Sequence, residues 1–350
     1  MKEKKYLSLY RSIKDKILCG EYTSGEKLPS KRVLADKKGL SVITVEKAYG
    51  MLTDEGYITP SQRSGYYVAD LNILMSPQGF KDSAVLSYLD EAPAALPPQD
   101  FEYASWFKTI RKVISEKGEQ LFIKSPNKGC AVLRNAIADY LLRYRGMTAS
   151  PEQIIIGSGS EQLYGTVVKI LGRDNIYGIE DPSYSQIEAV YISEGAGVKK
   201  LKMGPDGIER AALEKSDIDV LHVTPFQSFP TNVTTSLAKR YEYLRWAKNG
   251  RYIVEDDFNS EFFIPGRPIE SLYALDTCGT VIYINTFSKS LSPAMRMGYM
   301  ILPKKLLAVY DEKLGNFSCS VPVLDQYILS EFISSGSFER HLNRMRRKMK

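Results

Sequence analysis

The sequence predicts a two-domain protein in which a small α+β head precedes a larger α/β body with a mainly parallel sheet. Three observations support this prediction. A chain of 350 residues is too long for one ordinary hydrophobic core. Residues 1–70 show three helical patterns followed by two short β patterns. From about Phe101, strand and helix patterns alternate almost to the end of the chain, which is typical of parallel strands covered by helices.

We expect domain limits at the points where these patterns change. The head is predicted to span residues 1–70, and the body residues 99–335. Residues 71–98 hold four prolines among mixed polar and apolar residues, so they are predicted to form a linker with a short helix near residues 84–89. Residues 336–350 are expected to begin a small C-terminal domain.

The composition narrows the class of protein. Hydrophobic residues make up 43% of the chain, yet no apolar run is long enough to span a membrane and no signal-peptide core follows the charged start. The four cysteines are scattered without metal-type spacing, which is typical of reduced thiols in a cytoplasmic protein, and only two histidines are present for a metal site. The first 70 residues carry 13 Lys and Arg against 9 Asp and Glu, which is consistent with a nucleic-acid partner.

The head begins with three predicted helices. Apolar and aromatic residues recur at helical spacing from Tyr6 to Ile17, and Gly20 ends this first helix. Ser30 can cap a second helix over residues 31–38, which Gly39 stops. Similarly, Ser41 can cap a third helix that runs to about residue 55.

Two short strands follow the third helix, at residues 57–59 and 66–68, on either side of a hairpin turn at residues 61–65. Three short helices and a hairpin make a winged helix-turn-helix, although the pattern alone also allows another small helical domain. Specific motifs favour the first interpretation, because residues 6–69 closely resemble the GntR-type DNA-binding domain. They are Gly25-x-x-Leu28-Pro29-Ser30-x-Arg32-x-Leu34-Ala35, Ser41-x-x-Thr44-Val45-x-x-Ala48-Tyr49-x-x-Leu52-x-x-Glu55-Gly56 and Ser64-Gly65-x-Tyr67-Val68.

This resemblance implies that the third helix enters the major groove of double-stranded DNA with its N-terminus first, while the wing lies along the minor groove. The residues expected to contact bases or phosphates are Ser41, Val42, Thr44 and Lys47 on the third helix, Ser30 and Arg32 at the start of the second, and Arg63, Ser64 and Gly65 at the wing tip. The family often has Arg where Val42 stands. We therefore expect a bidentate contact to guanine to be missing here.

In the body, the apolar run at residues 281–284 predicts a buried strand that leads into a lysine, Lys289. A lysine at the end of a buried strand loses hydration, which lowers its pKa as Schiff-base formation requires. The hydroxyls of Thr286 and Ser288, together with Arg296, can bind a phosphate beside it. A surface turn with a solvated lysine is the alternative for an isolated Ser-Lys pair.

The whole run resembles the lysine segment of fold-type I pyridoxal-phosphate enzymes, Ser/Thr-x-Ser-Lys-x-x-x-Pro-x-x-Arg-x-Gly-Tyr, and every fixed position is met. The resemblance implies pyridoxal 5'-phosphate as the cofactor. Gly157-Ser158-Gly159-Ser160-Glu161-Gln162 follows another predicted strand and opens a helix, so the backbone around Ser160 and Glu161 is predicted to bind the phosphate.

Other segments resemble class I aminotransferases. In that family, the position of Tyr184 stacks on the pyridine ring, and the carboxylate that we assign to Asp256 keeps the pyridine nitrogen protonated. Asp257 is the second choice for this role, because strand alternation directs only one of the two at the ring. Phe258 and Phe229 stand where the family usually has Tyr and Asn, both of which contact the cofactor.

A GntR-type head joined to an aminotransferase-like body is the architecture of the MocR family of transcription regulators. The resemblance implies a DNA-binding homodimer that senses an amino acid or amine through the Schiff base at Lys289. Family members continue beyond the position of Lys350, so we expect the remaining small domain and its carboxylate-binding arginine to be absent from this chain.

Two alternatives remain open at this stage. The chain could be a working aminotransferase with an attached DNA-binding head, against which Phe229 and Phe258 count. It could also be a regulator whose body only dimerises and no longer binds the cofactor. The presence of Tyr184, Asp256, Lys289 and Arg296 counts against this alternative.

Overall fold

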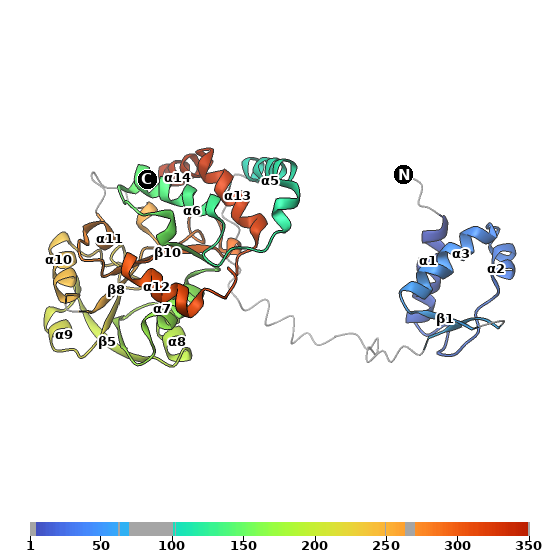
Figure 1. The fold of residues 1–350 in the computed structure, drawn as a ribbon, viewed down its shortest axis with the longest axis horizontal. Helices are drawn as coiled ribbons and strands as arrows, with labels where there is room; N and C mark the ends of the chain where they lie inside the picture. Colours follow the sequence, from blue (N-terminus) through green and yellow to red (C-terminus); the bar gives the residue numbers. More distant parts are fainter. Residues whose placement is uncertain are drawn as a thin grey trace. The chain divides into compact units, whose positions relative to one another are not determined.

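The computed structural model describes residues 5–61, 64–69, 101, 103–248, 250–262 and 270–348. The chain divides into two compact units, residues 1–94 and 95–350, and each unit is described by itself (Figure 1). The expected linker at residues 71–98 lies outside the described residues, as does the helix expected within it. Among the described helices, none has both the length and the apolar character needed to cross a membrane.

The first unit is the predicted winged helix-turn-helix. Its elements are α1 (Lys5–Leu18), α2 (Lys31–Lys38), α3 (Val42–Asp54), β1 (Ile58–Ser61) and β2 (Gly65–Val68). The two strands pair antiparallel, from Ile58 opposite Val68 to Ser61 opposite Gly65. The first unit thus has the order of helices and hairpin that the sequence predicts.

Local chemistry explains where the helices of this unit begin and end. The Ser30 hydroxyl accepts a hydrogen bond from the backbone N–H of Val33 at 3.3 Å, and Ser41 accepts one from Thr44 at 3.2 Å. Both serines therefore cap a helix N-terminus. Gly39 ends α2 in the left-handed conformation, with a φ of 60° that glycine adopts without strain.

The core of the first unit forms around one face of α3. Four residues at helical spacing are fully buried, namely Val45, Ala48, Tyr49 and Leu52. Residues of α1 pack against them, including Tyr10 and Ile13. The opposite face of α3 remains exposed, so the helix presents a free surface to a partner.

The second unit is built on an eight-stranded sheet with the order β3-β10-β9-β8-β7-β4-β5-β6. The strands are β3 (Ile154–Gly157), β4 (Ile176–Asp181), β5 (Gly197–Gly204), β6 (Gly207–Ile208), β7 (Val220–Val223), β8 (Tyr252–Asp256), β9 (Val281–Thr286) and β10 (Gly298–Ile301). Strands β5, β4, β7, β8 and β9 run parallel, whereas β10 is antiparallel to both of its neighbours. The prediction of a mainly parallel sheet is confirmed.

Helices cover both faces of this sheet (Figure 1). The α-helices are α5 (Tyr103–Lys117), α6 (Ala131–Tyr140), α7 (Ser160–Leu171), α8 (Ser185–Ser193), α9 (Arg210–Glu214), α10 (Leu237–Trp246), α11 (Leu272–Leu275), α12 (Lys304–Leu314), α13 (Val323–Ser334) and α14 (Ser337–Lys348). Short 3-10 helices are η1 (Gly118–Phe122), η3 (Pro151–Gln153), η4 (Ser260–Phe262) and η5 (Pro293–Met295), and η2 (Leu141–Arg145) is a π-helical turn.

The two faces carry separate hydrophobic cores. Helices α6, α13 and α14 pack on one face, whereas α7, α8 and α12 pack on the other. Strand β9 shows how alternation serves both cores: Tyr283 lies in the first, and Ile282 and Ile284 lie in the second. The parallel strands end at the same edge of the sheet, which is where α/β proteins of this kind bind their ligands.

Candidate cofactor site and nucleic-acid interface

A cavity of about 360 Å³ lies at the carboxyl ends of the parallel strands. All nine residues that the sequence assigns to the cofactor line it, namely Ser160, Glu161, Tyr184, Asp256, Phe258, Thr286, Ser288, Lys289 and Arg296. Tyr164, Ile187, Thr224 and Phe229 complete the lining. Segments up to 136 residues apart in the sequence thus meet in one place, from Ser160 on α7 to Arg296 after η5.

Lys289 reaches this cavity from the loop that follows β9. Its amine donates a hydrogen bond to Oδ1 of Asn259 at 2.5 Å and lies 5.1 Å from the centre of the Phe258 ring and 5.8 Å from that of Phe262. Burial lowers the pKa of this amine, and the nearby Glu261 carboxyl opposes the shift. The side chain is therefore suited to form a Schiff base with an aldehyde.

Asp256 supplies the carboxylate of the cavity. It is the last residue of β8 and is buried. The Tyr164 hydroxyl donates to its Oδ2 atom, and Nε2 of His222 lies 3.8 Å from the same oxygen. A carboxylate fixed in this way can bind a protonated ring nitrogen.

Asp257, the second choice from the sequence, is directed elsewhere. Its Oδ2 atom accepts hydrogen bonds at 2.8 Å from both the Arg145 guanidinium and the Tyr283 hydroxyl. Because Tyr283 belongs to the core on the opposite face of the sheet, strand alternation separates the two neighbouring acids. Asp257 thus balances a buried arginine, and Asp256 lines the cavity.

The other end of the cavity has the features of a phosphate site. Helix α7 begins at Ser160, directly after Gly159, which has a φ of +108°. A Cβ atom at Gly159 would lie 3.3 Å from Nη2 of Arg296, so the glycine lets the guanidinium approach the helix N-terminus closely. The same Nη2 atom lies 3.3 Å from Oε2 of Glu161. The Arg296 guanidinium and the N-terminus of α7 therefore meet at one point.

Aromatic rings line the remaining wall. The rings of Tyr184 and Phe229 have centroids 6.4 Å apart and meet edge to face at 76°. Both rings are exposed at their outer sides, so they lie at the mouth of the cavity. Taken together, an amine, a carboxylate, a phosphate site and aromatic walls match the functional groups of pyridoxal 5'-phosphate.

The first unit exposes most of the residues expected to contact DNA. Arg32, Val42 and Lys47 are exposed, and Lys47 lies 5.9 Å from the centre of the Tyr6 ring. The hydroxyls of Ser30 and Ser41 cap their helices by accepting a backbone hydrogen bond, and both residues are exposed.

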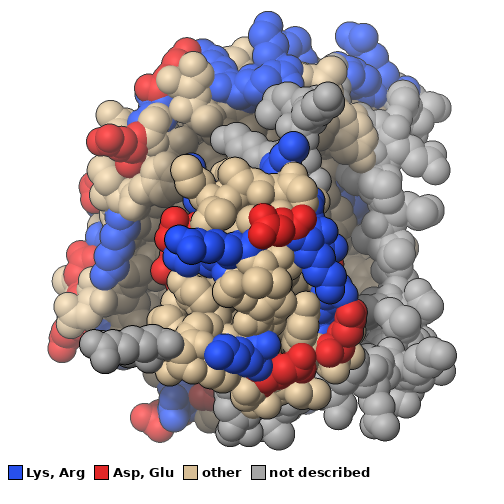
Figure 2. All heavy atoms as spheres, turned by 90° about the vertical axis from the view of Figure 1, so that its right-hand side faces the viewer, with Lys and Arg blue, Asp and Glu red and all other residues tan. Residues whose placement is uncertain are grey.

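The remaining positions of the expected interface have local partners. The Thr44 hydroxyl lies 2.8 Å from that of Ser41, and the Ser64 hydroxyl lies 2.5 Å from that of Tyr67, beside Gly65. Arg63 lies outside the described residues. Figure 2 shows basic and acidic side chains interspersed on the visible face, so positive charge is not gathered into one uninterrupted patch there.

Comparisons with known proteins agree with both halves of the structure. Residues 5–68 match the family described as bacterial regulatory proteins, gntR family, and residues 98–350 match the family of class I and II aminotransferases. The chain belongs to the MocR-type transcription regulators. Its body is a member of the aminotransferase family, and its cofactor is pyridoxal 5'-phosphate.

Similar proteins include regulators and an enzyme. The uncharacterized HTH-type transcriptional regulator YdeL of Bacillus subtilis is 32% identical over 98% of this chain and 76% of its own length. The probable rhizopine catabolism regulatory protein MocR of Rhizobium meliloti is 28% identical over 97% and 73%. The α-aminoadipate aminotransferase LysN of Thermus thermophilus, solved with N-(5'-phosphopyridoxyl)-L-leucine, is 28% identical with a TM-score of 0.63. The match covers 72% of this chain and 65% of LysN.

Sequence reasoning on this MocR-type regulator missed several residues around the cavity. Tyr164 lies one helical turn after Ser160, so the 3.6-residue period of α7 could have placed it on the same face. Asn259 follows the acidic end of β8, so its closeness in sequence to Asp256 could have indicated it. His222 lies on β7, and no local pattern indicates its approach to Asp256.

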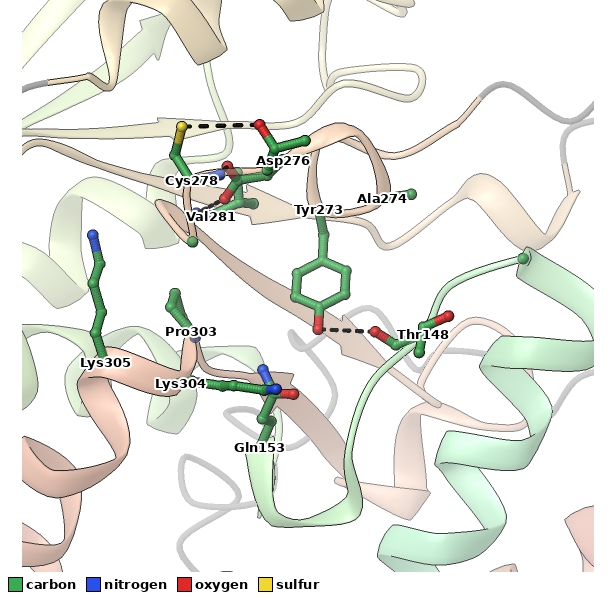
Figure 3. A pocket seen from close by; sticks show the side chains of 13 residues that line it. Thr148, Gln153, Tyr273, Ala274, Asp276, Cys278, Val281, Pro303, Lys304 and Lys305 are labelled. Atoms are coloured by element: carbon green, nitrogen blue, oxygen red, sulfur yellow. Dashed lines mark hydrogen bonds between the residues drawn. The ribbon is translucent and has the colours of Figure 1, made fainter.

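A second, more polar cavity of about 650 Å³ lies in the same unit. Figure 3 shows Tyr273 directed toward Thr148 across it, and the Tyr273 hydroxyl donates to the Thr148 carbonyl at 3.3 Å. The Asp276 carboxylate at its rim accepts hydrogen bonds from the backbone N–H groups of Cys278, Thr280 and Val281. Since this carboxylate is engaged in holding its own loop, we assign no chemistry to this cavity.

Proposed function

We propose that the body of this regulator senses an amino acid or an amine at Lys289, and that the result changes how the head holds operator DNA. The observation that carries the proposal is the convergence of Lys289, Asp256 and Arg296 on one cavity in a chain that also has a recognition helix. When bound, pyridoxal phosphate supplies an electrophilic carbon and an electron-withdrawing ring.

Each side chain then has a distinct role. Lys289 would hold the cofactor covalently, and the ligand amine would bind in the same cavity beside Lys289. Arg296 and the N-terminus of α7 would bind the phosphate. Asp256 would keep the ring nitrogen protonated, and Tyr184 would supply an aromatic wall for the ring. These assignments are supported by the positions of the side chains around the cavity.

The response of the head requires two states of the protein with different affinities for the ligand. We propose a cytoplasmic homodimer whose two heads bind two half-sites, arranged as a palindrome or as direct repeats. A ligand that favours one state of the body then changes the spacing or orientation at which the heads are held.

Transamination is a second candidate function, because the amine, the carboxylate and the arginine of the cavity are all present. Two substitutions argue for sensing. Phe258 and Phe229 line the cavity with hydrocarbon, whereas the aminotransferases that the body resembles usually have Tyr and Asn at these positions. We therefore propose that turnover, where present, is residual.

One experiment separates these functions. The purified chain is titrated with each standard amino acid while visible absorbance, keto-acid formation and binding to operator DNA are followed together. Sensing predicts a change in absorbance and DNA binding without steady product formation, whereas an enzyme forms keto acid continuously. Lys289→Ala should abolish the visible band and the ligand response, and Arg32→Ala should weaken DNA binding while the band persists. A ligand response that survives in Lys289→Ala contradicts the proposal.

A further inference from the structure

The first turn of α3 exposes two adjacent aliphatic side chains. Val42 is 42% exposed and Ile43 is 67% exposed, and Val33 at the start of α2 is 56% exposed. The buried face of α3 is a separate set of residues that are 0% exposed. The aliphatic groups at the helix N-terminus are therefore not needed for the core of this unit.

The two hydroxyls of this turn, on Ser41 and Thr44, contact each other. The Ser41 hydroxyl accepts from the Thr44 backbone and pairs with the Thr44 hydroxyl. On the next turn, the Glu46 carboxylate lies 2.5 Å from the amine of Lys31. Helix α3 also contains no Arg, Asn or Gln, and Lys47, its one residue that can form paired hydrogen bonds with guanine, lies beyond the first turn. The start of the recognition helix thus offers methyl groups to a partner.

We propose that Val42 and Ile43 recognise thymine through its 5-methyl group, and that the operator half-site carries A·T pairs where the first turn of α3 meets the major groove. This inference rests on the proposed binding of DNA by the head. The thymine methyl is the one apolar group in the major-groove pattern of the four bases, and apolar side chains contact it. A guanine at the same position would leave its acceptors without donors, which is unfavourable.

The contact with the thymine methyl group also predicts how much affinity is lost when that group is removed. Burial of one methyl-sized group contributes about 0.8 kcal/mol, which corresponds to about a four-fold change in affinity. Lys47 lies further along the helix and contributes charge, which attracts phosphate regardless of base sequence. Methyl recognition by Val42 and Ile43 should therefore be separable from phosphate binding by Lys47.

The experiment uses the full chain and a library of random DNA duplexes. Selection yields the preferred half-site, and each thymine in it is then replaced by deoxyuridine, which lacks only the methyl group. We expect one or two replacements to weaken binding about four-fold each. The same replacements should have no effect on the Val42→Ala, Ile43→Ala double variant. In the Lys47→Ala control, overall affinity should fall but the deoxyuridine penalty should remain.

A further variant tests the same point by gain of function. Val42→Arg should shift the base selected at that position from thymine to guanine, because arginine donates two hydrogen bonds to guanine. Equal affinity of the unaltered chain for duplexes with thymine and with deoxyuridine overturns the inference but not the proposed DNA binding. In that case Val42 and Ile43 would contact another protein instead. Failure to select any duplex overturns the proposed DNA binding, and this inference with it.

Discussion

The amine of Lys289 donates a hydrogen bond to the side-chain oxygen of Asn259 at 2.5 Å. This partner is uncharged, and burial lowers the pKa of the amine. At a given pH, the neutral form is therefore more abundant than it is for a lysine in water. The neutral amine is the form that attacks an aldehyde, so the uncharged partner favours capture of the cofactor.

Replacing Asn259 with Asp should slow cofactor capture at neutral pH. A carboxylate beside the amine stabilises its charged form, which raises the pKa of Lys289 and moves the capture rate profile to higher pH by about one unit or more. The rate is measured as the growth of visible absorbance after pyridoxal phosphate is added to cofactor-free protein. Asn259→Leu removes the contact without adding charge and should not move the profile upward. An Asp profile that coincides with that of the unaltered chain would show that the amine leaves Asn259 before it reacts.

Asp256 and Asp257 form a matched pair of neighbouring acids with different roles. Asp257→Asn should destabilise the body by roughly 3–5 kcal/mol, because it leaves the buried Arg145 guanidinium without its counter-charge. Asp256→Asn should cost less stability but alter the visible spectrum of the bound cofactor. Chemical unfolding and absorbance spectra of both variants measure the two effects. A large loss of stability in Asp256→Asn, together with a spectral change in Asp257→Asn, would mean that the two side chains exchange faces of the sheet.

Glu161 lies where it competes with the cofactor for Arg296. Its carboxylate is 3.3 Å from the guanidinium, at the helix N-terminus that would bind the phosphate. Glu161→Gln should therefore tighten binding of pyridoxal phosphate by up to about five-fold, in line with the ~1 kcal/mol that exposed ion pairs reach. The gain should shrink as salt is added. Glu152→Gln, which alters an ion pair with Arg134 outside the cavity, is the control and should change nothing.

Sequence reasoning succeeded in the head because its signals are local. Helix α2 begins and ends where Ser30 and Gly39 predict, since a hydroxyl cap and a left-handed glycine act on their own backbone. The buried face of α3 follows from the spacing of Val45, Ala48, Tyr49 and Leu52 alone. The exposure of Ile43 has no such signal, because an aliphatic residue inside a helical pattern is normally assigned to the core.

In the body, local sequence patterns predict single elements but not how these elements are arranged. The sequence predicts the strand at residues 281–284, but it does not predict that the antiparallel β10 separates β9 from β3, because strand neighbours are chosen by tertiary packing. Sequence motifs identify the cavity residues that are expected to contact the cofactor, such as Lys289 and Arg296. Tyr164 and His222, which approach Asp256 from two other elements, belong to no motif and appear only in three dimensions.

Helix α14 contacts two segments that neighbour the cavity, the loop of Lys289 and the segment after β8. Nε2 of His341 lies 2.9 Å from the carbonyl oxygen of Ser290, the residue after Lys289, so this nitrogen donates the hydrogen bond. Further along the helix, Nε of Arg346 donates to the carbonyl of Glu261 at 2.6 Å. The helix thereby holds both the lysine loop and the segment that follows β8. The imidazole of His341 is fully buried, which makes its hydrogen bond costly to lose.

The last prediction concerns the donor at residue 341. His341→Leu removes the N–H group and leaves the Ser290 carbonyl buried without this donor, so the loop should loosen and Lys289 should be positioned less accurately. We expect slower cofactor capture and a broader visible band, with the head still binding DNA. His341→Gln keeps a donor at a similar distance from the backbone and should restore much of the capture rate. Equal losses in the two variants would mean that the ring packing of His341 against Phe101 matters more than its hydrogen bond. Capture rates and spectra of the two variants, compared at equal thermal stability, separate these outcomes.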